Sequence, residues 1–350
     1  MDDERGGDCR QIDTMKADDY EARILEPHEY SLWDDFAVQS PQGTIFHNSD
    51  YLQVVADSSS SKLRVYGCFK DDELVGGCSL FVKDRGRIVS HATSTGSLTP
   101  YGGFLLPDLD NANVRKSGLV QDGVISALCD SIQKDRYSAV TITNSPDLRD
   151  VRSCLWRGWE GRVAYTYYVD LDNFNLGNFS RDIKKNVKKA IKSGFYVENL
   201  RDAELHYDLT ERVFQRQNLS APFKKEFLIK LMGVIEKKVC GNMWVARDKS
   251  GETAASHIRI WDDKRVYALT AASDPVFRDS GANQFLFVSV LEKMQKAGFH
   301  QINMMHGNTQ RLSYYAAGYN PTLVPYYSVT KRGFAYGMAS AIYSAMRNYR

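Results

Sequence analysis

The sequence predicts an α/β protein of two similar halves, each a mixed, mostly antiparallel sheet flanked by helices. Three observations lead to this prediction: the length, a repeated run of alternating apolar and polar residues, and a repeated order of elements after it. The 350 residues are too many for one ordinary domain and sufficient for two. With 43% hydrophobic and 25% charged residues, most of the chain is able to bury a core.

The repeated run is a pattern of three antiparallel strands. Residues 65–88 alternate apolar and polar side chains around two tight turns, as successive strands of a meander do. Residues 243–267 repeat the pattern, and Tyr66 placed on Trp244 keeps the two meanders in register without a gap. A duplicated supersecondary unit explains this match.

The same elements follow each meander. Helical periodicity runs over 114–134 in the first half and 282–297 in the second. Strand-like segments come next, at 138–144 and 300–306. Each half then has a short helix and a last strand. The distance along the chain from a glycine after this helix to a tyrosine pair is the same in both halves.

These boundaries divide the chain into four parts. Residues 1–19 have no hydrophobic period and are expected to form a disordered tail. We expect a first domain at 20–172 and a second at 180–332, which begins with a basic helix. Residues 333–350 are expected to form a C-terminal helical tail.

Composition excludes several classes of protein. Forty-five Lys and Arg residues against 43 Asp and Glu leave a net charge of +2, too small for a protein that binds nucleic acid over its whole surface. No apolar run is long enough for a membrane span, and the acidic start lacks the features of a signal peptide, so a cytoplasmic protein is expected. The six Cys and seven His residues have no metal-binding spacing, which predicts reduced core thiols and no metal site.

Positive charge is concentrated in one predicted helix. Residues 181–194 hold six basic residues and one acidic residue, a net charge of +5, behind a suitable N-cap at Ser180 and before a suitable C-cap at Gly194. The helix has an apolar stripe and a basic stripe. One interpretation is a solvated helix face; the other, which the scarcity of interspersed acids favours, is an anion-binding surface.

The order of elements resembles the GNAT acyltransferase fold, and two copies in one chain resemble the FemAB-like (tandem GNAT) acyltransferases. The resemblance covers about residues 20–332. It rests on the following segments: the basic helix 180–198, the loop and helix 273–287, the closing segment 307–320, the helix start 46–55 and the turn 100–103.

The resemblance implies that the basic helix contacts phosphates of a nucleotide-linked, lipid-linked or tRNA-linked acceptor. We expect this acceptor in a cleft between the halves, lined by the basic helix and the loop 100–104. The acceptor contacts that it implies are Lys184, Lys185, Asn186, Lys188, Tyr101 and Gly102.

For the donor, the resemblance implies acyl-CoA as a co-substrate, with no permanently bound cofactor. GNAT proteins hold the pyrophosphate on backbone amides at a helix start, where free N–H groups attract an anion and glycine allows a close approach. The residues at these positions here are Arg278, Gly281, Ala282 and Asn283, where Arg278 and Gly281 match and Asn283 departs from the small residue that the GNAT pattern has at its end. The alternative is an ordinary helix N-terminus with a flexible entry.

The resemblance also implies catalytic residues in the closing segment. Asn308 matches by position, and either Tyr314 or Tyr315 matches the tyrosine that protonates a departing thiolate; the alternative is that both rings simply pack. Candidate bases near the same strands are His306 and Asp274, with His257 beside them, although each also suits a structural role. No Ser-His-Asp or Cys-His arrangement is evident, so direct attack by the acceptor is expected.

The predicted function is acyl transfer from a CoA-type donor to an amine of an anionic acceptor, such as a sugar nucleotide or a cell-envelope glycan precursor. An aminoacyl-tRNA-dependent enzyme of the FemAB type is one alternative, although many such enzymes have Phe-Lys where this chain has Tyr315-Ala316. The other alternative is a non-catalytic adaptor that binds nucleic acid or anionic lipid, with residues 334–350 as a peripheral membrane contact.

Overall fold

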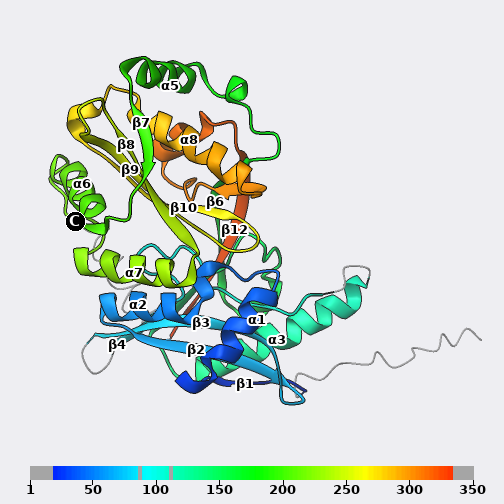
Figure 1. Ribbon diagram of the computed structural model, residues 1–350. Helices are drawn as coiled ribbons and strands as arrows, with labels where there is room; N and C mark the ends of the chain where they lie inside the picture. The colour runs from blue at the N-terminus through cyan, green and yellow to red at the C-terminus, as the bar shows by residue number, and fades with distance from the viewer. Residues whose placement is uncertain (1–18, 86–88, 110–112, 334–350) are drawn as a thin grey trace, which may run out of the picture.

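The computed structural model describes residues 19–85, 89–109 and 113–333, which form one mixed sheet flanked by helices (Figure 1). The sheet has 12 strands in the order β1-β2-β3-β4-β5-β12-β6-β11-β10-β9-β8-β7. Their bounds are β1 Glu21–Ile24, β2 Lys62–Lys70, β3 Glu73–Arg85, β4 Val89–Thr93, β5 Ala139–Thr143, β6 Glu160–Asp170, β7 Tyr196–Asn199, β8 Gly241–Arg247, β9 Thr253–Trp261, β10 Val266–Ser273, β11 Gln301–Asn303 and β12 Thr322–Arg332. Because most neighbours are antiparallel, the predicted fold class is confirmed.

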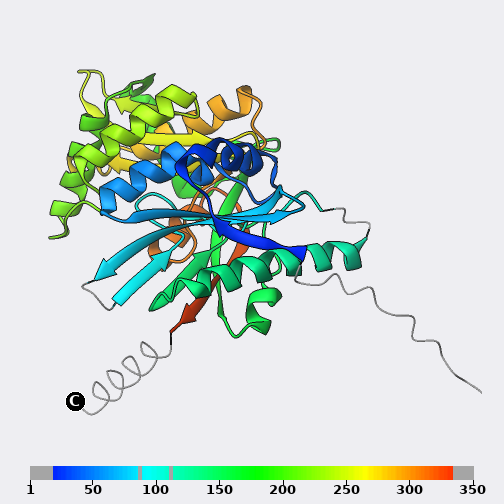
Figure 2. The same cartoon turned by 90° about the horizontal axis from the view of Figure 1, so that it is seen from below.

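Helices cover both faces of this sheet. They are α1 Tyr30–Gln39, α2 Ser49–Ser59, α3 Val114–Lys134, α4 Arg152–Trp156, α5 Arg181–Ser193, α6 Ala203–Gln215, α7 Lys225–Lys238, α8 Ala282–Lys296 and α9 Gln310–Ala317. In the first half, α3 packs on one face while α1 and α2 lie on the other (Figure 2). In the second half, α5, α8 and α9 share one face, and α6 and α7 cover the other.

The two halves repeat each other, as the meander predicts. Strands β2–β4 and β8–β10 are the two meanders, and each is followed by a helix (α3 or α8) and a strand parallel to the last strand of the meander (β5 or β11). The basic helix α5 begins after Ser180, whose Oγ accepts a hydrogen bond from the backbone N–H of Ile183, and ends at Gly194 with φ of 77°.

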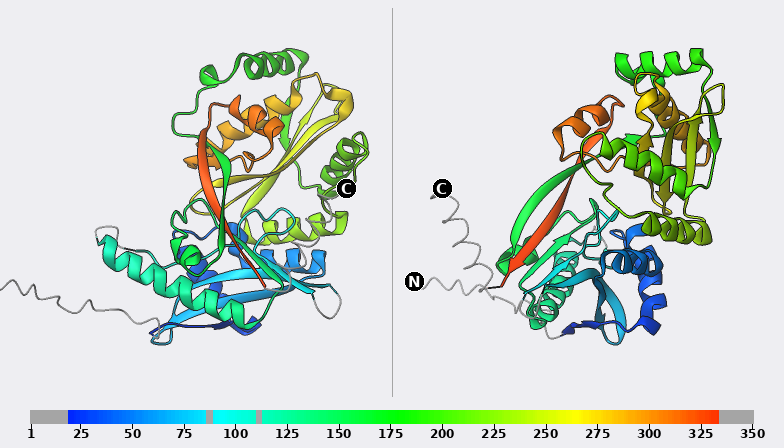
Figure 3. Two further views of the ribbon diagram at one scale, coloured as in Figure 1. Left: turned by 180° about the vertical axis from the view of Figure 1, so that it is seen from behind. Right: turned by 90° about the vertical axis from the view of Figure 1, so that its left-hand side faces the viewer.

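The last strand of each half completes the sheet of the other half. β12 lies between β5 and β6, and β6 lies between β12 and β11. Figure 3 shows these two strands as a ribbon that runs from one half to the other. The division of the chain at 172–180 stays a prediction. β6 precedes this division and pairs with β11, which follows it, while β12 follows the division and pairs with β5, which precedes it. The expected tails, apart from Asp19 and Gly333, lie outside the described residues.

A shared hydrophobic core also joins the halves. Phe46 and Tyr101 of the first half are buried together with Phe227 and Tyr267 of the second. The Phe46 and Tyr267 rings meet edge to face, with centroids 5.0 Å apart, which is a favourable geometry for an aromatic pair.

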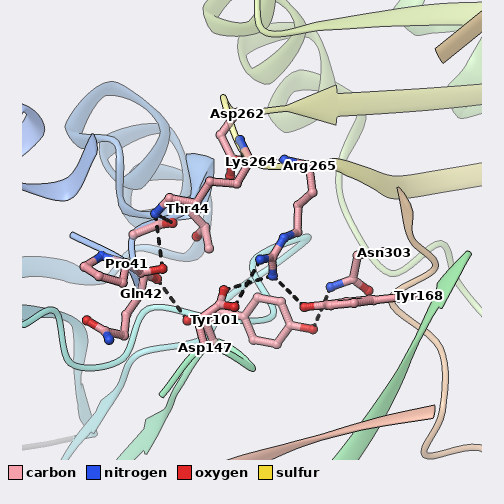
Figure 4. Close-up of polar contacts among 12 residues, drawn as sticks. Pro41, Gln42, Thr44, Tyr101, Asp147, Tyr168, Asp262, Lys264, Arg265 and Asn303 are labelled. Atoms are coloured by element: carbon pink, nitrogen blue, oxygen red, sulfur yellow. Dashed lines mark hydrogen bonds and ion pairs between the residues drawn. The ribbon is translucent and has the colours of Figure 1, made fainter. Parts of the chain in front are cut away.

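The turn between β9 and β10 adds polar contacts across the same boundary (Figure 4). Lys264 Nζ donates to the carbonyl oxygens of Pro41 and Gly43 at 3.2 and 3.0 Å, at the C-terminal end of α1. Arg265 forms an ion pair with Asp147 at 2.9 Å and donates to the Tyr168 hydroxyl at 2.6 Å. Lys264 thus satisfies carbonyl groups of the turn that follows α1, near the negative end of that helix dipole.

The exchanged strands predict that the halves depend on each other. We expect residues 1–174 and 175–350, expressed separately, to aggregate or remain unfolded, because each fragment lacks the strand that pairs with its β5 or β11. Mixed or co-expressed, they should form a folded one-to-one complex, measured by light scattering and circular dichroism. Two stable monomeric fragments would contradict this expectation.

Candidate functional site

The parallel strand pair of the first half is closed by its own loop. β4 and β5 pair as far as Thr93 and Thr141. Beyond that point the segment 94–106 fills the space, with the Gly102 N–H donating to the Thr143 carbonyl at 3.2 Å. The last residues of this segment are buried, so among the residues that the structure describes the space beyond the paired ends of these strands is filled by side chains.

Two predicted acceptor residues lie in this filling segment. Tyr101 is 1% exposed; its hydroxyl accepts from Asn303 Nδ2 at 3.1 Å, and its ring packs on Tyr326. A Cβ atom on Gly102 would lie 2.3 Å from the Ser94 carbonyl oxygen. Tyr101 serves the packing between the halves and Gly102 the packing within the first half, and neither is part of the site proposed below.

The corresponding strands of the second half diverge. β10 and β11 pair only at Val266–Ile302 and Tyr267–Asn303, and a bulge in β10 follows Tyr267. The Asn303 side chain accepts from Thr166 Oγ1 at 2.7 Å and from the Met305 N–H at 2.8 Å, which turns the chain away from β10. A bulge at a strand divergence is typical of functional sites.

A chain of buried polar side chains lies near this divergence, on the face covered by α8 and α9. Arg259 Nη2 lies 2.9 Å from His257 Nδ1, and His257 Nε2 lies 2.8 Å from Asn283 Oδ1. Asn283 Nδ2 donates to the Tyr315 hydroxyl at 3.0 Å, which is 2.8 Å from the Tyr319 hydroxyl. Strand β9 and helices α8 and α9 each contribute side chains to this hydrogen-bonded chain.

The electrostatics of this chain are unusual because a cation is buried without an acid. Arg259 is 2% exposed, stacks on the Phe287 ring at 5.3 Å, and has no carboxylate partner among residues 19–85, 89–109 and 113–333. Burial lowers the pKa of Arg259 to about 10, so it stays charged at neutral pH. Burial and the neighbouring guanidinium hold the pKa of His257 well below its usual value, so this histidine is neutral.

The structure separates the two candidate tyrosines. Tyr314 is 71% exposed and points away from the buried chain of side chains, whereas the Tyr315 hydroxyl is part of it. Burial raises the pKa of Tyr315, and the charge of Arg259 acts in the opposite direction. Of the two, Tyr315 is the better candidate for a proton donor.

Two other predicted catalytic residues have structural partners. Asn308 brackets the backbone of Tyr165, accepting from its N–H at 2.8 Å and donating to its carbonyl at 3.0 Å, and also donates to Tyr326. Asp274 forms an ion pair with Arg212 at 2.6 Å and caps the short helix that follows it. A carboxylate engaged in this way is a poor general base.

His306 remains the better candidate for a base. It is half-buried in the turn after β11. Burial, followed by the charge of Arg259, lowers the pKa of His306, while the backbone of Met305 acts in the opposite direction. The lowered pKa keeps the imidazole neutral and able to accept a proton.

The predicted donor loop is pressed against the basic helix. Gly281 has φ of 82°, and a Cβ atom there would lie 2.2 Å from the carbonyl oxygen of Asn186 in α5. Lys189 Nζ donates to the Asp279 carbonyl at 2.6 Å, while Arg278 is exposed. What approaches Gly281 closely is therefore the backbone of α5.

The other two predicted donor residues face inward. Ala282 is buried, and its N–H donates to Ser280 Oγ at 3.1 Å. Asn283 directs its side chain to His257 and Tyr315. This explains why the position has an asparagine in place of the small residue expected in the GNAT pattern.

The basic helix packs on α8 and lies at the end of the molecule remote from the first half (Figures 1 and 3). Lys184 donates to the Gly177 carbonyl at 2.9 Å. An open hollow of about 760 Å³ is lined by Lys185, Lys188, Lys189, Ile191, Lys192 and Ser193. The prediction of a cleft lined by both this helix and the loop 100–104 is thus wrong, because the basic face of the helix adjoins the donor loop instead.

At least two further cavities have linings from both halves, and the one beside α6 and α7 lies at a place that no predicted site residue indicated. It has a volume of about 520 Å³ and is lined mainly by α6, α7 and the loop between them, including Tyr207, Glu211 and Lys224, with Ser58 and Ser97 from the first half. The sequence feature that could have indicated this cavity is the polar, proline-containing stretch 217–225 between two helices.

Comparison with known proteins agrees with this geometry. Residues 177–315 match the acetyltransferase (GNAT) domain family, and this match covers the donor loop and most of α9. No characterised protein sequence matches the chain significantly. The chain is a tandem GNAT-fold protein. The acyltransferase class expected from the FemAB-like resemblance agrees with the family of its second half.

Solved structures show the same architecture along nearly the whole chain. The crystal structure of FemX has a TM-score of 0.65 at 12% identity and covers 88% of this chain and 96% of its own. L-PGS from Bacillus licheniformis has a TM-score of 0.56 at 12% identity, covering 91% and 96%. A tandem GNAT protein from the clavulanic acid biosynthesis pathway has a TM-score of 0.55 at 12% identity, covering 89% and 98%.

The contact at Gly281 can be tested against a glycine of the same backbone conformation. Gly298 has φ of 88°, and a Cβ atom there would have no other atom within 4 Å, so Gly298→Ala should cost only the backbone strain, about 1 kcal/mol. Gly281→Ala should lower the free energy of unfolding by about 1–3 kcal/mol more, because α5 must shift. Urea unfolding measures both, and equal losses would contradict the contact.

The buried histidines predict a loss of stability in mild acid. Burial lowers the pKa to about 4 for His47 and about 3 for His206, and His257 is also lowered. The unfolded chain therefore binds more protons below about pH 6.5, and the free energy of unfolding should fall as the pH decreases from there, by at most about 1.4 kcal/mol per histidine per pH unit. Urea unfolding at pH 7.5 and 5.5 measures this; equal stability would contradict it.

Proposed function

We propose that the protein transfers an acyl group from a phosphate-bearing donor, acyl-CoA in the first instance, to an amine. The observation that carries this proposal is the position of the basic face of α5. It adjoins the loop before α8, in the half that matches the GNAT domain family, where β10 and β11 diverge.

The donor site combines three features that attract phosphate. The N-terminal end of α8 has the positive end of the helix dipole. Arg278 is exposed in the loop before it. Lys185 and Lys188 line the open hollow on α5, and Lys189 ties that helix to the loop. The basic residues first expected to bind the acceptor are therefore proposed to bind the donor.

The acceptor is proposed to enter the cavity beside α6 and α7 and to reach the donor, which lies on the opposite face of the sheet, where β10 and β11 diverge. The aromatic and polar lining of this cavity suits a molecule with an amine and an apolar portion, and Lys224 offers a cation to an anionic acceptor such as a sugar nucleotide or a glycan precursor. The amine nitrogen attacks the thioester carbon, and the carbon–sulfur bond breaks. The neutral His306 takes the amine proton, and the departing thiolate takes the proton of Tyr315.

A second candidate is an aminoacyl-tRNA donor, with a small-molecule or lipid-linked acceptor. The extent of the exposed basic face on α5 favours it, since a tRNA presents many phosphates, and FemX is among the structural neighbours. Another neighbour is a putative lysylphosphatidylglycerol synthetase, which suggests a lipid headgroup as acceptor. None of the helices in the described ranges is long and apolar enough to cross a membrane.

Charge removal on α5 tests the donor site. The triple variant Lys185→Gln, Lys188→Gln and Lys192→Gln should raise the donor dissociation constant about tenfold, because each lysine contributes a modest attraction to phosphate. Its affinity should also depend less on salt. Calorimetric titration with acetyl-CoA and with aminoacyl-tRNA, over a series of salt concentrations, measures both effects.

The matched control changes three exposed helical lysines elsewhere, Lys116, Lys134 and Lys230, to Gln. It alters the net charge equally and should leave the donor affinity unchanged. A larger effect on tRNA than on acetyl-CoA would favour the second candidate. Equal affinities in the triple variant, the control and the wild type would contradict a donor site on α5.

A further inference from the structure

Arg259 is a buried cation that donates to the carbonyls of Ile258 and Thr270 but has no carboxylate partner among the described residues. We propose that Arg259 is a positioning residue which, through His257 and Asn283, holds Tyr315 as the proton donor to the leaving group and balances the negative charge that Tyr315 then acquires. This inference rests on the proposed function, and it names the group that makes Tyr315 suitable for its step.

The hydrogen bonds between Arg259 and Tyr315 can run in one direction only. A guanidinium has donors and no acceptor, so His257 Nδ1 must accept from Arg259 Nη2 across 2.9 Å. The neutral ring then carries its proton on Nε2, which donates to Asn283 Oδ1 at 2.8 Å. This sets the amide orientation, so Asn283 Nδ2 donates to Tyr315 at 3.0 Å.

This direction leaves the phenol proton of Tyr315 available. Because the Tyr315 oxygen accepts from Asn283, its own proton cannot be directed back along the chain. Tyr319 lies 2.8 Å away and is able to donate to the same oxygen, which leaves the Tyr315 proton for a ligand. When this proton passes to the thiolate, the O–H bond breaks, an S–H bond forms and the electron pair stays on the phenolate. The proton that His306 takes from the attacking amine is then released, and protonation of the phenolate returns both groups to their starting states.

The charge of Arg259 acts on Tyr315 without an acid to offset it. The titratable groups that act on Tyr315 are Arg259 from β9 and Tyr319 from the turn after α9, and the charge of Arg259 also reaches His306 after β11. Within the described part of the chain no acid faces it. A carboxylate partner would cancel the field of Arg259, whereas an unpaired cation in a dry site stabilises a phenolate that forms during reaction. The Arg259 Nε atom also lacks a partner.

The test compares Arg259→Met, Tyr315→Phe and their double variant, with Tyr314→Phe as the matched control. We expect kcat to fall about 10²-fold in each single variant, with donor and acceptor KM unchanged. The double variant should be no slower than the slower single variant, since both changes remove the same proton transfer. Tyr314→Phe removes an exposed hydroxyl of the neighbouring residue and should stay within about twofold of the wild type.

A second measurement uses the resting protein and needs no turnover. With tyrosine labelled at Cζ, NMR titration should show the Tyr315 resonance ionising at higher pH in Arg259→Met than in the wild type. If Arg259→Met does not fold, Asn283→Ala breaks the chain while keeping the cation, and it should shift the same resonance in the same direction.

These measurements distinguish a failure of the inference about Arg259 from a failure of the proposed function. An unchanged Tyr315 titration in Arg259→Met or Asn283→Ala, or losses in kcat that multiply in the double variant, would overturn the inference. If the wild type transfers no acyl group to any amine tested, the proposed function fails, and the role of Tyr315 as proton donor is overturned with it. A shifted titration would in that case show only the charge coupling between Arg259 and Tyr315.

Discussion

The exchange of β6 and β12 is the constraint on which the rest of the structure depends. Each half provides the strand that the other half requires next to its fifth strand, so the sheet is continuous and the halves have a defined relative position. The Lys264 and Arg265 contacts and the shared aromatic core then join surfaces that the exchange has already brought together. One half can in this way support the other without having a site of its own.

The halves have diverged in what occupies the space between their parallel strands. In the first half, segment 94–106 fills this space with buried side chains. In the second half, β10 and β11 separate after two residue pairs, and a buried polar chain ending at Tyr315 lies beside them. A duplicated fold therefore has one half that provides packing and another that provides polar groups.

The second half places its cations in two distinct settings. Lys185, Lys188 and Lys192 of α5 are exposed and screened by salt, which suits the binding of a donor that must also leave. Arg259 is buried and unscreened, with a guanidinium held by His257 and by backbone carbonyls. A charge of that kind acts on a group at a fixed position, such as the Tyr315 phenol.

The sequence by itself determined the fold class, the duplication, the bounds of α3, α5 and α8 and the caps of the basic helix, because these depend on local periodicity and on residues a few positions apart. It also identified Tyr315, Asn283 and His257, although it could not tell Tyr315 from Tyr314 or recognise that these residues join Arg259. Only the tertiary structure decided the strand exchange, the place of α5 beside α8 and the burial of Tyr101, because each depends on contacts between residues far apart in the chain. The cavity beside α6 and α7 also depends on such contacts, since its lining comes from both halves.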